Sequence, residues 1–154
     1  KKKINVKFKD TEINIGKSLT PFNSQNTTWH ISIFPLMYLP VTCSMRATDI
    51  WRSFIAIRIF KFNSKNILFD RPSVFQKRNY HNLVKDFKDE ALMYINNKKI
   101  MEILSNEKLK KGIRNFSSNI ISCYKALIKE GFFKKKELIY LKAWLKDCQS
   151  LKSF

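Results

Sequence analysis

Apolar residues take every second position in three short segments of the first third of the chain, residues 3–8, 29–34 and 41–45. A period of two places the apolar side chains on one face of a β-strand. We therefore expect these segments to be strands of one small sheet. Residues 10–28 are rich in small polar side chains and are predicted to be mainly loop.

From residue 49 onward the apolar residues follow a helical period. Ile50, Phe54 and Ile57 form one stripe, and further apolar residues lie beside it, so the pattern predicts a helix buried on most of its circumference. Turn residues at 62–66 end this helix, and residues 67–79 are predicted to be a loop.

Residues 80–95 show the clearest amphipathic pattern, with apolar residues at i, i+3, i+4 and i+7. The predicted apolar face consists of Tyr80, Leu83, Val84, Phe87, Ala91, Tyr94 and Ile95. Two later helices are predicted over 113–127 and 138–148, and Gly131 joins them into a helical hairpin. The predicted fold class is α/β, with a few short strands followed mainly by α-helices.

The composition agrees with a folded protein. The chain has 154 residues, of which 44% are hydrophobic, so it can form a core as one domain or part of one. Only 3 residues are Gly, which leaves little room for a glycine-rich phosphate loop. The first residue is Lys rather than Met, so we expect residues 1–154 to be a single domain or a fragment that lacks an upstream portion.

The formal net charge is +18, which changes the range of possible partners. A strongly basic chain is typical of proteins that bind nucleic acid or an anionic membrane surface. However, 24 of the 30 basic residues are Lys, and they are scattered along the chain. Specific readers of bases and phosphates favour Arg, so compositional drift toward Lys, Asn, Ile and Phe explains the charge better, and we expect no specific nucleic-acid partner.

Cys43, Cys123 and Cys148 are odd in number and widely spaced, which argues against a structural zinc site or a disulfide framework. Unpaired cysteines and the lack of a signal-peptide pattern favour a reducing, cytoplasmic compartment. The longest apolar region, 31–45, is interrupted by two prolines and is shorter than the about 20 residues of a spanning helix, so no transmembrane segment is expected.

Charged residues of both signs lie where the first long helix begins. Thr48 or Asp49 can serve as the helix N-cap, with Arg52 three residues later as a local partner. Alternatively, Asp49 is a functional carboxylate at the edge of the sheet, kept ionised by two arginines, and Arg46 meets an anionic group of a substrate.

Two other segments contain candidate functional residues. Residues 21–29 offer amides and hydroxyls that suit an array of sugar hydroxyls, or form an ordinary turn. His81 is a candidate metal ligand or a polar residue at a helix start. Asp86, Asp89 and Glu90 are expected on the solvated outer face of the amphipathic helix, too far from His81 to complete a metal site.

Three blocks together resemble the STELLO glycosyltransferase family. They are PFNSQNTTW at 21–29, FPLMYLPVTCSMRATDIWRSFIA at 34–56 and VFQKRNYHNLVKDFKDE at 74–90. The tail GFFKKKELIYLKAWLKD at 131–147 is also similar to the end of that family. The blocks occur in the order of the family and cover most of the chain.

The resemblance implies the C-terminal portion of a GT-A-like domain that transfers a sugar from a nucleotide-sugar donor to a hydroxyl acceptor. It implies Asp49 as the general base and His81 as a ligand of a divalent metal, Mn²⁺ or Mg²⁺. The residues implied to bind the donor or line the pocket are Gln25, Asn26, Arg46, Arg52, Arg78 and Asn79. Arg46, Arg52 and Arg78 among these would offset the charge of the departing diphosphate.

This chain departs from the GT-A pattern because it has no DxD motif, on which such enzymes hold the metal and the diphosphate. Plant members of the family are Golgi proteins that work alongside cellulose synthase, so a Golgi location and a role in polysaccharide synthesis are implied as well. The alternatives are a basic nucleic-acid-binding module and a non-catalytic partner of a polysaccharide synthase.

Overall fold

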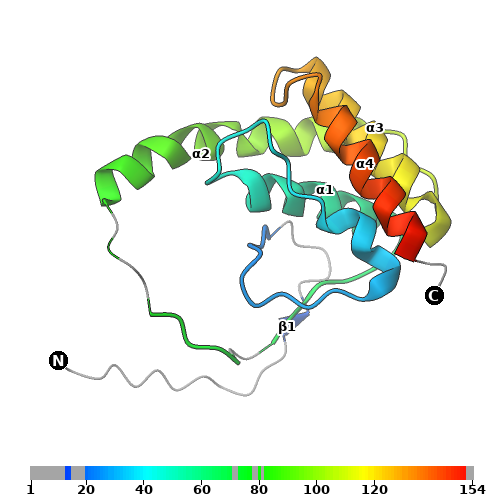
Figure 1. Cartoon of the computed structure of the whole chain (residues 1–154), viewed down its shortest axis with the longest axis horizontal. Helices are drawn as coiled ribbons and strands as arrows, with labels where there is room; N and C mark the ends of the chain where they lie inside the picture. Colours follow the sequence, from blue (N-terminus) through cyan, green and yellow to red (C-terminus); the bar gives the residue numbers. More distant parts are fainter. Residues whose placement is uncertain (1–12, 15–19, 71–72, 78–79, 81, 152–154) are drawn as a thin grey trace.

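A computed structural model describes residues 13–14, 20–70, 73–77, 80 and 82–151. These residues form a mainly helical bundle (Figure 1). The helices are η1 (Ile31–Met37), α1 (Thr48–Phe62), α2 (Leu83–Asn106), η2 (Ile113–Asn115), α3 (Phe116–Lys129) and α4 (Glu137–Ser150). The strands β1 (Ile13–Asn14) and β2 (Leu68–Phe69) pair antiparallel, with Ile13 opposite Phe69.

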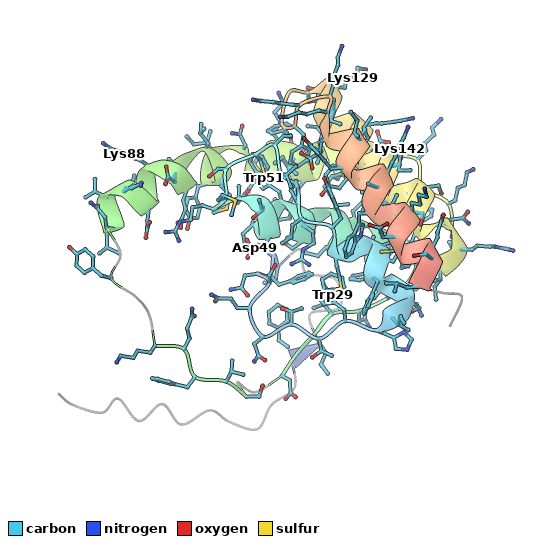
Figure 2. All side chains as sticks on the ribbon, viewed as in Figure 1. Trp29, Asp49, Trp51, Lys88, Lys129 and Lys142 are labelled. Carbon is cyan, nitrogen blue, oxygen red and sulfur yellow. The ribbon has the colours of Figure 1, made fainter. Side chains whose placement is uncertain are left out.

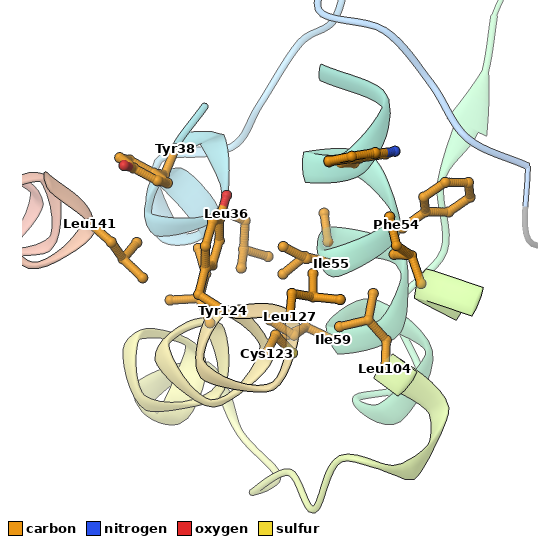
Figure 3. Packing of buried hydrophobic residues seen from close by; sticks show 14 of the residues in the cluster. Leu36, Tyr38, Phe54, Ile55, Ile59, Leu104, Cys123, Tyr124, Leu127 and Leu141 are labelled. Atoms are coloured by element: carbon orange, nitrogen blue, oxygen red, sulfur yellow. The ribbon is translucent and has the colours of Figure 1, made fainter. Parts of the chain in front are cut away.

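Helix α1 lies at the centre of the bundle and contacts α2, α3 and η1. Its side chains from Trp51 to Ile57, together with Ile59 and Phe60, are buried. Figure 3 shows Ile55 and Ile59 of α1 packed toward Leu127 and Cys123 of α3. The prediction of a helix buried around most of its circumference is therefore confirmed, because apolar residues on all sides of α1 find a partner.

The strands predicted at 29–34 and 41–45 are wrong. Most of 29–34 belongs to the 3₁₀ helix η1, whose first turn is capped because the His30 side chain accepts a hydrogen bond from Ser32 N at 3.3 Å. Pro35 lies inside η1, and its ring nitrogen has no hydrogen to donate to a strand. Residues 41–45 form bends and a turn. The strand predicted at 3–8 lies outside the described residues.

The backbone at 41–42 is held by a side chain that lies far away in the sequence. Glu137 is fully buried in the first turn of α4, and its carboxylate accepts hydrogen bonds from Val41 N at 3.0 Å and Thr42 N at 2.8 Å. The hydroxyls of Tyr38 and Thr42 also donate to Glu137. These bonds use the backbone donors that a sheet would need, which explains why no strand forms here.

The helical hairpin predicted around Gly131 is confirmed. Gly131 has φ of 82°, a conformation that glycine adopts without the steric cost of a Cβ atom. Gly131 N donates to Ile128 O at 3.1 Å and Phe132 N donates to Leu127 O at 2.9 Å, which is the Schellman arrangement at a helix C-terminus. This turn lets α4 return along α3 and pack against it.

Helix α2 forms where a helix was predicted, but its apolar stripe is not the face that packs. Met93, Ile100 and Leu104 are the buried residues of α2. The large side chains of the predicted apolar face are exposed, namely Tyr80, Leu83, Val84, Phe87, Tyr94 and Ile95. The first turns of α2 extend beyond the bundle (Figure 1), and the residues of α2 that are buried occur from Met93 onward.

All three cysteines lie in the described part of the chain, and none is in a disulfide, as predicted from their spacing. Burial raises the pKa of Cys123 to about 12, and burial followed by the charge of Glu137 raises the pKa of Cys43 to about 12. Both thiols therefore stay protonated and poorly nucleophilic in the folded protein at neutral pH. Within the stretches that the structure covers, none of the helices has the length and apolar character needed to cross a bilayer.

The raised thiol pKa values predict a loss of stability in alkaline solution. The unfolded thiols lose their protons near the ordinary pKa of 9.0, whereas the folded ones keep them to about 12. The unfolded state thus binds fewer protons in this range, and the free energy of unfolding falls as pH rises from 9 toward 12. Urea titrations at a series of pH values measure this slope, and Cys123→Ala, which removes one titrating group, should make it shallower.

Candidate functional site

The polar loop at 21–29 lies against the beginning of α1. Phe22 N donates to Ser53 Oγ at 3.2 Å, and Ser24 N donates to Asp49 Oδ2 at 3.1 Å. Figure 2 shows Asp49 at the start of α1, with Trp29 on the segment beneath it. The structure thus brings the 21–29 loop and the start of α1 together, although Ser24 and Asp49 are 25 positions apart in the sequence.

Asp49 is not the N-cap of α1. Ala47 occupies that position without a side-chain cap, and Thr48 Oγ1 instead donates to Met45 O at 3.0 Å. The capping hypothesis for Thr48 and Asp49 is therefore wrong, and so is the expectation that a strand leads into Asp49. The half-buried Asp49 carboxylate lies in the first helical turn, where the partial positive charge of the helix end stabilises an anion.

Arg52 fixes the same loop from inside the protein. Its side chain is only 3% exposed, its guanidinium lies 4.8 Å from the Trp29 ring centre and 5.3 Å from that of Phe22, and its Nη2 donates to Ser24 Oγ at 3.0 Å. Burial lowers the pKa of Arg52, and the nearby charge of Asp49 opposes this shift. In this conformation Arg52 holds the loop, while its role toward a diphosphate stays a prediction.

Arg46 connects the start of α1 to α2. Its guanidinium forms an ion pair with Asp86, and Ser44 Oγ donates to Asp89 O at 3.3 Å. Asp86 was expected on a solvated outer face, but its side chain is 21% exposed and faces Arg46. That expectation is wrong for Asp86, because Asp86 lies on the face of α2 that is turned toward Arg46.

A third segment completes the surroundings of the site. Asn26 Nδ2 donates to Ser73 Oγ at 3.2 Å, which ties the 21–29 loop to residues 73–77. Between this loop and α2 lies a groove of about 620 Å³. We call it the α2 groove, and it is lined by Gln25, Arg46, Gln76, Leu83, Asp86, Phe87, Glu90 and Tyr94.

Three of the predicted site residues, Arg78, Asn79 and His81, lie outside the described residues, so their predicted roles stay predictions. Of the residues that the structure does describe, no group of three or more His, Cys, Asp or Glu side chains is arranged to hold a metal ion. Asp49 and the α2 groove are therefore the parts of the candidate site that the geometry defines.

Sequence reasoning missed several residues of this site. Ser24 stood within the quoted 21–29 block, but nothing in the sequence singled it out as the partner of Asp49. Phe87 and Tyr94 were assigned to the core because their spacing is helical. The sequence did contain a signal that these two aromatic residues belong to a site. Asp86 and Glu90 lie next to this stripe and are acidic in a strongly basic chain.

Comparison with known proteins identifies the family. The model of the STELLO glycosyltransferases matches residues 46–154, which include Arg46, Asp49 and helices α1 to α4. The chain belongs to the STELLO glycosyltransferase family. The resemblance noted from the sequence blocks is thereby confirmed.

One curated relative is a protein described as probable glycosyltransferase STELLO1 of Arabidopsis thaliana. It is 25% identical over 129 residues, which are 84% of this chain and 16% of the relative. This STELLO family chain therefore spans less than one-fifth of the length of that relative. No solved structure matches the chain.

Proposed function

We propose that this STELLO family protein forms the acceptor side of a glycosyl-transfer site of GT-A type. The reaction would transfer a sugar from a nucleotide-sugar donor to a hydroxyl acceptor. The observation that carries the proposal is the family match over 46–154, which includes a half-buried carboxylate, Asp49, held beside the α2 groove by the 21–29 loop.

Asp49 is suited to the role of general base. Ser24 N holds Oδ2, and the structure shows no partner for Oδ1 among the described residues, so Oδ1 can accept the proton of an acceptor hydroxyl. A base must be held still as well as exposed, and the buried helix α1 provides that rigidity. The hydroxyl oxygen then attacks the sugar carbon of the donor as the bond to the diphosphate breaks.

The donor-binding half of the site would need further residues in addition to those described. A GT-A enzyme holds its metal on a DxD motif, and these 154 residues contain none. His81 remains the proposed metal ligand, and a bound Mn²⁺ or Mg²⁺ would supply positive charge for the leaving diphosphate. We accordingly propose that the DxD-bearing half of the domain lies outside residues 1–154.

The proposal is tested by adding Mn²⁺ and uridine-diphosphate sugars to the full-length protein, in which we propose that residues 1–154 are joined to the DxD-bearing half. We expect binding of the nucleotide sugar that depends on the metal, or release of uridine diphosphate when an acceptor is present. The competing nucleic-acid hypothesis predicts binding to random DNA that weakens steeply with salt. Steep, salt-dependent DNA binding with no response to Mn²⁺ and nucleotide sugar would overturn the enzyme proposal.

A further inference from the structure

We propose that the α2 groove binds a neutral, hydroxyl-rich saccharide, stacked on the rings of Phe87 and Tyr94. This inference rests on the proposed function, since it assigns a chemical class to the acceptor of the same site. It is carried by three properties of the groove, namely its charge, its exposed aromatic rings and its polar groups, together with its position next to Asp49.

The charge of the lining argues against an anionic ligand. Among the described residues, the charged side chains that line the groove are Arg46, Asp86 and Glu90, whose formal charges sum to −1 in a chain of net charge +18. Arg46 is in addition paired with Asp86. Among the described lining residues, a phosphate or sulfate group would meet no cation other than Arg46, which is already paired with Asp86, so this part of the lining disfavours a diphosphate or a sulfated chain.

Two aromatic rings in the groove are open to solvent. Phe87 is 67% exposed and Tyr94 is 61% exposed, although both belong to an amphipathic stripe that ordinarily would be covered. They are two helical turns apart on α2, which corresponds to about 10 Å along the helix axis. Their rings therefore offer apolar surface over more than one sugar ring, and the C–H faces of sugars pack well on the electron-rich faces of aromatic rings.

The polar groups of the groove suit hydroxyls. Gln25 and Gln76 each carry an amide that both donates and accepts hydrogen bonds, as a sugar hydroxyl does. Glu90 adds an acceptor, and its Oε2 lies 3.5 Å from the Tyr94 hydroxyl. A few polar groups beside apolar surface are the usual composition of a small-molecule site.

The groove also lies next to the proposed base. Gln25 directly follows Ser24, whose backbone N–H donates to Asp49 Oδ2. Arg46 lines the groove and precedes Asp49 by less than one helical turn. Asp49 does not itself line the groove, so a saccharide stacked on α2 would reach this carboxylate past the side of the groove that Gln25 and Arg46 form.

The test measures binding of soluble neutral oligosaccharides built from glucose, xylose or mannose units, by calorimetry or saturation-transfer NMR. We expect at least one of them to bind, and Phe87→Ala and Tyr94→Ala each to weaken its binding about tenfold through loss of ring contact. The matched control is Tyr140→Ala on α4, since Tyr140 is a surface tyrosine outside the groove and should leave binding unchanged. A thermal melt checks the fold of each variant.

The outcomes separate this inference from the proposed function. If none of the neutral oligosaccharides binds, or if the Phe87 and Tyr94 variants bind like Tyr140→Ala, the inference is overturned. A sulfated heparin fragment that binds and loses affinity with Tyr94→Ala would also overturn it. Oligosaccharide binding without any response to Mn²⁺ and nucleotide sugar would support the inference while contradicting the transferase proposal.

Discussion

Replacing Asp49 with Asn is expected to reduce sugar transfer by a factor of about 10² to 10⁴, the usual contribution of a general base. The amide has the shape of the carboxylate and can still accept the hydrogen bond from Ser24 N, so the loop stays in place. It cannot take up a proton from the acceptor hydroxyl. The measurement is the initial rate of uridine-diphosphate release with saturating donor and acceptor.

The matched control for this substitution is Asp89→Asn, which removes an exposed carboxylate on α2 that does not line the groove. It should leave the transfer rate unchanged. If Asp49→Asn transfers sugar at the rate of the unchanged protein, Asp49 serves only to anchor the 21–29 loop. A non-catalytic role in a polysaccharide-synthesising complex would then be favoured over an enzyme.

Replacing Glu137 with Gln is expected to lower the free energy of unfolding by about 3 to 5 kcal/mol, because the donors around this fully buried carboxylate lose a charged acceptor. The carboxylate accepts hydrogen bonds from Val41 N, Thr42 N and the hydroxyls of Tyr38 and Thr42. A Gln side chain presents an NH₂ group, itself a donor, to some of them. Urea denaturation measures the change, and hydrogen exchange at the Val41 and Thr42 amides locates it.

Glu102→Gln provides the control, since Glu102 is an exposed residue of α2 and its substitution should change stability by less than about 0.5 kcal/mol. A loss below about 1 kcal/mol for Glu137→Gln would show that water or other groups satisfy the donors. A large loss would establish that the Glu137 carboxylate is a major link between the 38–42 segment and α4. The same bonds position the 41–45 turn, which leads directly to Arg46 and Asp49.

Much of the helical structure could be predicted because its causes are local. The stripe of Ile50, Phe54 and Ile57 marks α1, and the glycine after Glu130 marks the end of α3, since only a residue tolerant of positive φ closes that turn easily. Asp49 could also be singled out as a candidate, because the sequence block that contains it resembles the STELLO family.

The rest depended on contacts between residues far apart in the sequence. Residues 41–45 have a strand-like alternation, but the backbone N–H of Val41 donates to Glu137, which lies 96 positions later in the sequence. Arg46 and Asp86 are 40 residues apart in the sequence. The helical periodicity of α2 alone does not show that Asp86 faces Arg46. No local pattern contains these pairings.

The sequence by itself determined where the later helices form, how α3 and α4 connect and which family the chain resembles, because periodicity, turn residues and motif order are properties of neighbouring residues. Only the tertiary structure decided which face of α2 packs and which is open. The α2 stripe is apolar, but its N-terminal turns extend beyond the bundle, so Phe87 and Tyr94 stay exposed and line a groove beside Asp49. Periodicity shows that a helix has an apolar face, and packing decides what covers that face.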